Sequence, residues 1–334
     1  MHPLSRLGRF ALAILLCAIL PGCTRSDSGS GTSRPKLGMM PKLVGISYFN
    51  AAESGAREAA TELDIELDYD GPAVDSAEEQ VKIVDRWIAQ GYDMIAVAPN
   101  DPELIAPALA RAKRAGITIL TWDADANTEA SGREVFVSQA PVEEIGHTLV
   151  DLVGEAIGGA GKAVILTGSA TSPNQNAWIQ VMRARLAEKY PKIELLETLV
   201  SDEDQSKAYR MSRDVINAHS DLKAIWAITT VALPGAAKAV RDAGKGDTVF
   251  VTGLSLPNRM REYVMDGTIK NFVLWNPIDL GYLTVHAARI LREGKLLPGE
   301  QSIGRLSKIR VSPGEVLLGP PLVFDRENIG QFNF

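Results

Sequence analysis

Residues 117–125, Ile-Thr-Ile-Leu-Thr-Trp-Asp-Ala-Asp, decide how the rest of the chain is interpreted. The apolar and β-branched residues up to Thr121 predict a strand of a parallel sheet buried on both faces. Asp123 would follow Trp122 at the carboxyl end of that strand, where open α/β sheets bind their ligands. A carboxylate can accept hydroxyl hydrogen bonds and an indole can cover an apolar sugar face, so Asp123 is a candidate ligand anchor. The alternative is that Asp123 caps the next loop.

The first residues are typical of an export signal. Arg6 and Arg9 precede an apolar run at 10–20 that is too short to span a bilayer, and Leu20-Pro21-Gly22-Cys23 resembles the lipobox of bacterial lipoproteins. We therefore expect a signal peptide at 1–22, a lipid on Cys23 and a flexible Ser- and Gly-rich tether at 23–39. The alternative is an ordinary secretory signal. Removing Cys17 with the signal would leave no pair of thiols for a disulfide.

Short apolar runs alternate with amphipathic segments from residue 43 onward. Strands are expected at 43–47, 65–69, 94–99 and 117–121, with helices between them, and the alternation repeats from residue 143 to 274. Repeated β-α-β units predict parallel sheets covered by helices, and the length suits two lobes. The expected fold is therefore α/β with two doubly wound lobes, and a cleft between such lobes is a preferred ligand site.

Composition and motifs argue against several functions. The chain has 334 residues and a net charge of −6, without a basic tract for nucleic acid. No dinucleotide fingerprint, P-loop or nucleophile elbow is present, and the histidines do not have metal-ligand spacing. Asp123 and Asp125 need not share a site, so glycosidase chemistry has weak support. We expect no enzyme activity, catalytic residue, metal or cofactor.

Polar and aromatic side chains follow several predicted strands, in both halves of the chain. Singly, each Asn or Asp could be a helix cap and each Trp a core residue, but capping does not explain the whole set. The candidate ligand-binding residues from this pattern are Phe49, Asp123, Asn174, Gln175, Trp178, Trp275 and Asn276.

Collinear segments of the chain resemble the periplasmic sugar-binding proteins of bacterial ABC importers. The resemblance is to the ribose-binding type, and within it to the rhamnose-binding and autoinducer-2-binding group. It rests on MPKLVGISYFNAAESGA (40–56), YDGP (69–72), QGYDMIAVAPNDP (90–102), TWDAD (121–125), NQNAW (174–178), ALPGAAKAV (232–240), VTGLSLPNRMREYV (251–264), LWNPIDLGYLTV (274–285) and FDRENIGQFNF (324–334). It implies a three-segment hinge with crossings near residues 139, 275–277 and 304–307. The implied lobes are residues 40–138 with 277–305, and residues 139–276 with 306–334.

The same resemblance implies specific ligand contacts. Lys42 and Asp123 match a Lys and an Asp that hold the ligand in the autoinducer-2 group, and Pro234 and Ala236 match two further positions. An Asp-Gln pair of that group is replaced here by Asn174-Gln175, which changes charge and hydrogen-bond polarity. This favours a neutral deoxyhexose such as rhamnose, with autoinducer-2 or a pentose as alternatives. Phe49, Trp178 and Trp275 are the expected ring-stacking residues.

The resemblance also implies partners. We expect an exported monomer, tethered through Cys23, that delivers sugar to an ABC permease and ATPase. A ligand sensor for a membrane histidine kinase would share the fold and pocket. A repressor's effector domain is disfavoured because a signal and tether take the place of a DNA-binding domain.

Overall fold

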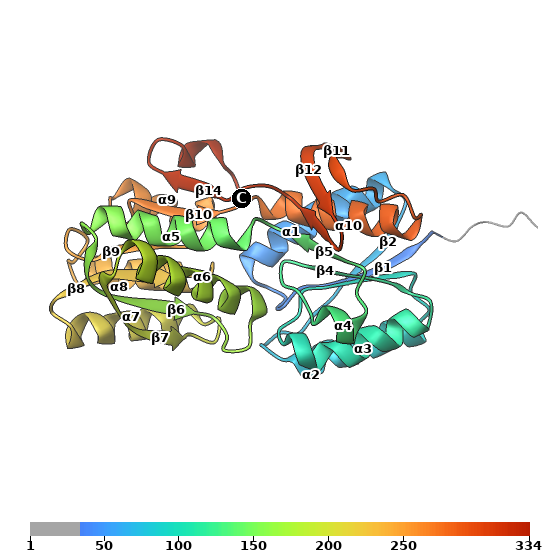
Figure 1. Ribbon diagram of the computed structural model, residues 1–334, viewed down its shortest axis with the longest axis horizontal. Helices are drawn as coiled ribbons and strands as arrows, with labels where there is room; N and C mark the ends of the chain where they lie inside the picture. Colours follow the sequence, from blue (N-terminus) through green and yellow to red (C-terminus); the bar gives the residue numbers. More distant parts are fainter. Residues whose placement is uncertain (1–33) are drawn as a thin grey trace, which may run out of the picture. The chain divides into compact units, whose positions relative to one another are not determined.

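The computed structural model describes residues 34–334, which form two groups of strands (Figure 1). The first is an eight-stranded sheet in which β1 to β5 and β13 run parallel and β11 and β12 are antiparallel additions. Its spatial order is β11 (Gly299–Ile303), β12 (Leu306–Ser312), β13 (Glu315–Leu317), β5 (Val135–Ser138), β4 (Thr118–Trp122), β3 (Met94–Val97), β1 (Lys36–Met40) and β2 (Glu66–Tyr69).

The second group is a parallel four-stranded sheet with an antiparallel strand pair beside it. The sheet order is β7 (Lys192–Val200), β6 (Ala160–Thr167), β8 (Leu222–Ala227) and β9 (Phe250–Gly253), and the pair is β10 (Asn271–Leu274) with β14 (Leu322–Asp325). A single bridge from Leu254 to Val273 joins the two. Two α/β units with mainly parallel sheets confirm the predicted fold class.

Helices cover the faces of these sheets (Figure 1). The first lobe contains α1 (Ser47–Glu62), α2 (Ala77–Ala89), α3 (Pro102–Arg114), α4 (Thr128–Ser131) and α10 (Pro277–Arg292). The second contains α5 (Val142–Ala156), α6 (Pro173–Lys189), α7 (Gln205–Ala218), α8 (Ala232–Asp242) and α9 (Pro257–Met265), followed by the short 3-10 turn η1 (Ile329–Gln331). No helix in residues 34–334 has the length and apolar character needed to cross a membrane.

Strand β1 explains why its sheet is apolar on both faces. Leu37 and Met39 pack in the core that includes α1 and α10, whereas Met40 packs with Trp87 on the other side. A side chain at Gly38 would meet the Trp87 ring at 2.5 Å, so this glycine lets the indole lie directly on the strand. Because successive side chains of a strand point to opposite faces of the sheet, β1 contributes residues to two separate cores.

The start of the lobe differs from the prediction. The expected strand at 43–47 is a turn leading into α1, with Gly45 at φ +83°, and the first strand is β1. Residues 36–39, assigned to the tether, therefore belong to the sheet. Gly38 interrupts the apolar residues Leu37, Met39 and Met40, so the sequence pattern does not indicate a strand there. The rest of the tether, the signal peptide and Cys23 lie outside the described residues.

The third hinge crossing also differs from the prediction. The chain leaves the first sheet after β5 and returns to that lobe between β10 and α10, near the expected residues 139 and 275–277. However, β12 and β13 extend the first sheet, and only β14 pairs in the second group. The last passage therefore lies between Leu317 and Leu322, and residues 306–317 belong to the first lobe.

Candidate functional site

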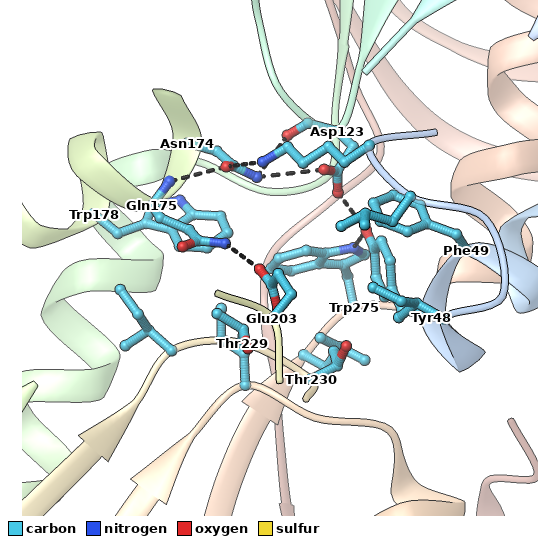
Figure 2. A pocket seen from close by; sticks show the side chains of 16 residues that line it. Tyr48, Phe49, Asp123, Asn174, Gln175, Trp178, Glu203, Thr229, Thr230 and Trp275 are labelled. Atoms are coloured by element: carbon cyan, nitrogen blue, oxygen red, sulfur yellow. Dashed lines mark hydrogen bonds between the residues drawn. The ribbon is translucent and has the colours of Figure 1, made fainter. Parts of the chain in front are cut away.

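A cavity lies where the two lobes meet (Figure 2). Its volume is about 50 Å³, several times the ~10–15 Å³ that one water requires. Both lobes contribute to its wall, and most of the contributing residues lie at or just beyond strand ends. The lining residues are Lys42, Leu43, Ile46, Tyr48, Phe49, Asp123, Asn174, Gln175, Trp178, Glu203, Ile228, Thr229, Thr230, Leu254, Leu274 and Trp275.

Asp123 follows β4 directly and has a left-handed backbone with φ of 61°. That conformation is uncommon for a residue other than glycine, and such strain is found most often at functional sites. The Asp123 amide donates to Val137 O at 3.2 Å, which fixes the backbone against β5. The side chain is 3% exposed and turns into the cavity.

A chain of hydrogen bonds holds the Asp123 carboxylate. The Trp275 indole N–H donates to the Tyr48 hydroxyl at 2.7 Å, and that hydroxyl donates to Asp123 Oδ1 at 2.7 Å. All three side chains are buried. Because Trp275 follows β10 and Tyr48 begins α1, this chain links the two lobes. Figure 2 shows Tyr48 between the indole and the carboxylate.

Lys42 forms a second link between the lobes. Its Nζ donates to Ser172 Oγ and to Asn174 Oδ1, each at 2.6 Å. The Asn174 amide group donates to the backbone oxygen of Asp123 at 3.2 Å and, more weakly, to Asp123 Oδ2 at 3.4 Å. Lys42, Asn174 and Asp123 thus satisfy one another, and a bound ligand would have to replace part of this network.

Gln175 holds a second carboxylate at the cavity. Its Oε1 accepts from Thr167 Oγ1 at 2.6 Å and from the Gly168 amide at 2.8 Å, which fixes the side chain. Its Nε2 then donates to Glu203 Oε1 at 2.9 Å. Glu203 comes from the turn between β7 and α7, so this turn meets the segment that joins β6 to α6.

Burial controls the charges of these groups. It raises the pKa of Asp123, although the nearby Lys42 ammonium opposes the shift. It lowers the pKa of Lys42, opposed by Asp123 and Glu203, and raises the pKa of Glu203, opposed by the hydrogen bond from Gln175. Two carboxylates and one ammonium are thus confined in a small space, which favours a ligand rich in hydrogen-bond donors.

Three of the predicted aromatic residues line the cavity: Phe49, Trp178 and Trp275. The Trp178 and Trp275 rings are 5.9 Å apart and inclined by 56°, so they form two adjoining walls. The buried Trp178 indole N–H has no hydrogen-bond partner among residues 34–334. A ligand oxygen would satisfy this donor.

Seven of the ten predicted ligand-binding residues line the cavity, and three do not. Pro234 and Ala236 are buried in α8, while the wall after β8 is made by residues 228–230. The Asn276 side chain caps α10, accepting from the Ile278 amide at 3.0 Å. The structure therefore supports the alternative reading of Asn276 as a helix cap.

Trp122 and Asp125 also do not line the cavity, and their contacts stabilise the fold instead. Trp122 is fully buried and its indole donates to Met40 O at 3.0 Å, so it cannot cover a sugar face. Asp125 pairs with Arg133 and accepts from the Thr121 hydroxyl at 2.5 Å. Asp123 and Asp125 therefore do not share a site.

Tyr48 and Glu203 are the main residues that sequence reasoning missed. Tyr48 directly follows the expected strand at 43–47, so its position was the same signal that indicates Phe49. Glu203 follows β7 in the stretch Ser201-Asp202-Glu203-Asp204, which has the composition of a solvated turn. Its position after the carboxyl end of a parallel strand was the available signal.

Comparison with known proteins identifies the family. The model described as "Periplasmic binding protein domain" matches residues 37–296. The chain belongs to this family. It is thus a binding protein and not an enzyme, and residues 34–334 contain no cluster of His, Cys, Asp and Glu able to hold a metal ion.

Individual relatives cover most of the chain. The ribose import binding protein of Escherichia coli is 24% identical over 87% of this chain and 93% of its own length. A solute-binding protein from Clostridium phytofermentas with bound L-rhamnose is 30% identical, with a TM-score of 0.83 over 89% of this chain and 98% of that one. LsrB from Clostridium saccharobutylicum in complex with AI-2 is 27% identical, with a TM-score of 0.83 over 90% and 100% of the two chains.

Proposed function

We propose that this protein captures a small sugar in the cavity between its lobes and delivers it to an ABC permease. The observation that carries the proposal is the meeting of Lys42, Asp123, Gln175 and Trp275 in one cavity, with both lobes contributing. Charge-assisted hydrogen bonds would hold hydroxyl groups, and the indoles would cover apolar C–H faces. The relatives with bound monosaccharides support this class of ligand.

We propose a neutral deoxyhexose such as L-rhamnose as the preferred ligand. At position 174 an amide side chain accepts from Lys42 and donates toward Asp123. A carboxylate there could not donate, and it would place two negative charges side by side. The neutral amide therefore suits a ligand whose own hydroxyls both donate and accept.

Export and membrane anchoring complete the proposal. The family assignment supports a periplasmic or cell-surface location, and the sequence Leu20-Pro21-Gly22-Cys23 supports a lipid on Cys23. Intact-mass measurement of the protein purified from membranes tests the anchor. A Cys23→Ser variant should lose both the lipid mass and membrane association. An unmodified Cys23 would contradict the anchor.

Binding is tested by calorimetric titration with L-rhamnose, D-ribose and AI-2. The proposal predicts saturable one-to-one binding, with L-rhamnose bound most tightly. Binding of AI-2 alone would refute the rhamnose preference while leaving the binding function intact. The alternative of a sensor for a histidine kinase predicts the same titration, so uptake of labelled sugar must separate the two. Loss of uptake on deletion of the gene supports transport, whereas normal uptake supports sensing.

A further inference from the structure

Glu203 is held at the cavity by an unusual backbone. Asp202 and Glu203 are consecutive non-glycine residues with left-handed φ angles of 55° and 51°. Two such residues in succession are costly and persist only where the surroundings enforce them. The turn ends at Asp204, whose side chain caps α7 by accepting from the Lys207 amide at 2.8 Å. The strained turn therefore gives Glu203 a defined position.

A glycine on a neighbouring loop makes room for this carboxylate. A Cβ atom placed on Gly168 would lie 1.9 Å from Glu203 Oε1, so no other residue fits at position 168 without displacing Glu203. Gly168 also donates its amide hydrogen to Gln175, the residue that bonds Glu203. The segment that joins β6 to α6 and the strained turn after β7 thus fix the position of one carboxylate.

The charges of the cavity give this carboxylate a chemical role. Lys42 is the one cationic residue of the wall, and it faces both Asp123 and Glu203. Asp123 accepts hydrogen bonds from Tyr48 and Asn174, and Glu203 accepts one from Gln175 and interacts with the Thr229 hydroxyl. A carboxylate has about four acceptor sites, so Glu203 keeps acceptor capacity for a ligand. A ligand that offers a hydroxyl hydrogen is favoured there, and an anion would meet uncompensated negative charge.

We propose that Glu203 is a ligand-binding residue that selects neutral sugars, by accepting a hydrogen bond from one ligand hydroxyl and repelling sugar acids. This inference rests on the proposed sugar-binding function. Glu203 would add a second carboxylate to the ligand contacts and would exclude sugar acids from the cavity.

The test compares Glu203→Gln with the exposed control Glu197→Gln by calorimetry. Glutamine keeps an acceptor oxygen for Gln175 but loses the charge. We expect Glu203→Gln to weaken the best neutral sugar of the panel at least ten-fold and Glu197→Gln to leave its affinity unchanged. One monodeoxy analogue of that sugar should bind wild type and Glu203→Gln equally, because the hydroxyl that contacts Glu203 is missing. D-galacturonate should not bind wild type.

Gly168→Ala provides a second variant, since the added methyl group displaces the carboxylate without removing it. It should reproduce the loss of affinity while retaining a cooperative unfolding transition. If wild type binds a neutral sugar and both variants bind it equally well, the role of Glu203 is overturned and the sugar-binding function stands. Tight binding of D-galacturonate would overturn the exclusion of anions. Absence of binding by every sugar would overturn both proposals.

Discussion

Lys42 Nζ donates a 2.6 Å hydrogen bond to Asn174 Oδ1, across 132 positions of sequence and from one lobe to the other. Lys42 is only 7% exposed, so its charge depends on protein partners rather than on water. Asn174 in turn contacts Asp123, which connects the cation and the anion of the cavity through a neutral amide. A sugar that enters must offer hydroxyls in place of the Lys42–Asn174–Asp123 bridge. The hydrogen bonds from Trp275 to Tyr48 and from Tyr48 to Asp123 would still connect the lobes around it.

Asp123→Ala should weaken sugar binding strongly. The substitution removes the acceptor of the Tyr48 hydroxyl and a carboxylate whose charge stabilises the Lys42 ammonium. Loss of a charged acceptor with buried partners costs about 2–4 kcal/mol, which is roughly 30-fold to 1,000-fold in affinity. Calorimetric titration measures the change. Asp214→Ala, at an exposed position of α7, is the control and should bind normally. Unchanged affinity in Asp123→Ala would remove Asp123 from the site.

Asn174→Asp should destabilise the ligand-free protein at neutral pH. The Asn174 amide nitrogen lies 3.4 Å from Asp123 Oδ2, so a carboxylate at this position would face another carboxylate. Repulsion between buried like charges lowers the free energy of unfolding and weakens binding of neutral sugars. Asn217→Asp, at an exposed position of α7, is a control for an added charge. Equal urea midpoints for Asn174→Asp and Asn217→Asp would contradict this electrostatic account.

Much of the site followed from one rule applied to the sequence, namely that ligands bind beyond the carboxyl ends of parallel strands. The rule located Asp123, Asn174, Gln175 and Trp275, because the strands before them are plain apolar runs. It failed where a strand was misplaced. Gly38 makes β1 look like part of a tether, although the glycine is there to admit the Trp87 ring.

Other positions depend on contacts that one sequence does not display. Pro234 and Ala236 occupy helix α8, and the cavity wall is made a few residues earlier, at the end of β8. Glu203 depends on a left-handed turn and on space left by Gly168, 35 residues away in the chain. Such a long-range steric relation cannot be recognised from local composition.

Glu203→Gln should stabilise the ligand-free protein above pH 4.5. Burial raises the pKa of Glu203 above its ordinary value of 4.5, so the folded state binds more protons than the unfolded state between these two pKa values. The free energy of unfolding contributed by Glu203 therefore falls as pH rises through that window. Glutamine carries no charge, so it removes the cost of burying the ionised Glu203 carboxylate. Urea unfolding between pH 4.5 and 8 should show an advantage for Glu203→Gln that grows with pH. Lower stability than wild type at pH 8 would contradict the inferred burial.

Gly55→Ala should destabilise the first lobe. A Cβ atom on Gly55 would lie 1.8 Å from Ile278 O, and one on Gly281 would lie 1.9 Å from Ala52 O, so α1 and α10 pack backbone to backbone. Because a backbone cannot yield like a side chain, the cost should reach about 3 kcal/mol or more. Thermal unfolding measures this loss. Gly330→Ala has open space around the added methyl and should be neutral. A Gly55→Ala protein as stable as Gly330→Ala would show that the helices separate easily.

A crystal structure of the protein with L-rhamnose tests the central claim most directly. The account predicts one sugar between the lobes, with hydroxyls within hydrogen-bond distance of Lys42, Asp123 and Glu203 and with a ring face against Trp178 or Trp275. A sugar bound elsewhere on the surface, with the network of Lys42, Asn174 and Asp123 intact and the cavity filled only by water, would contradict it.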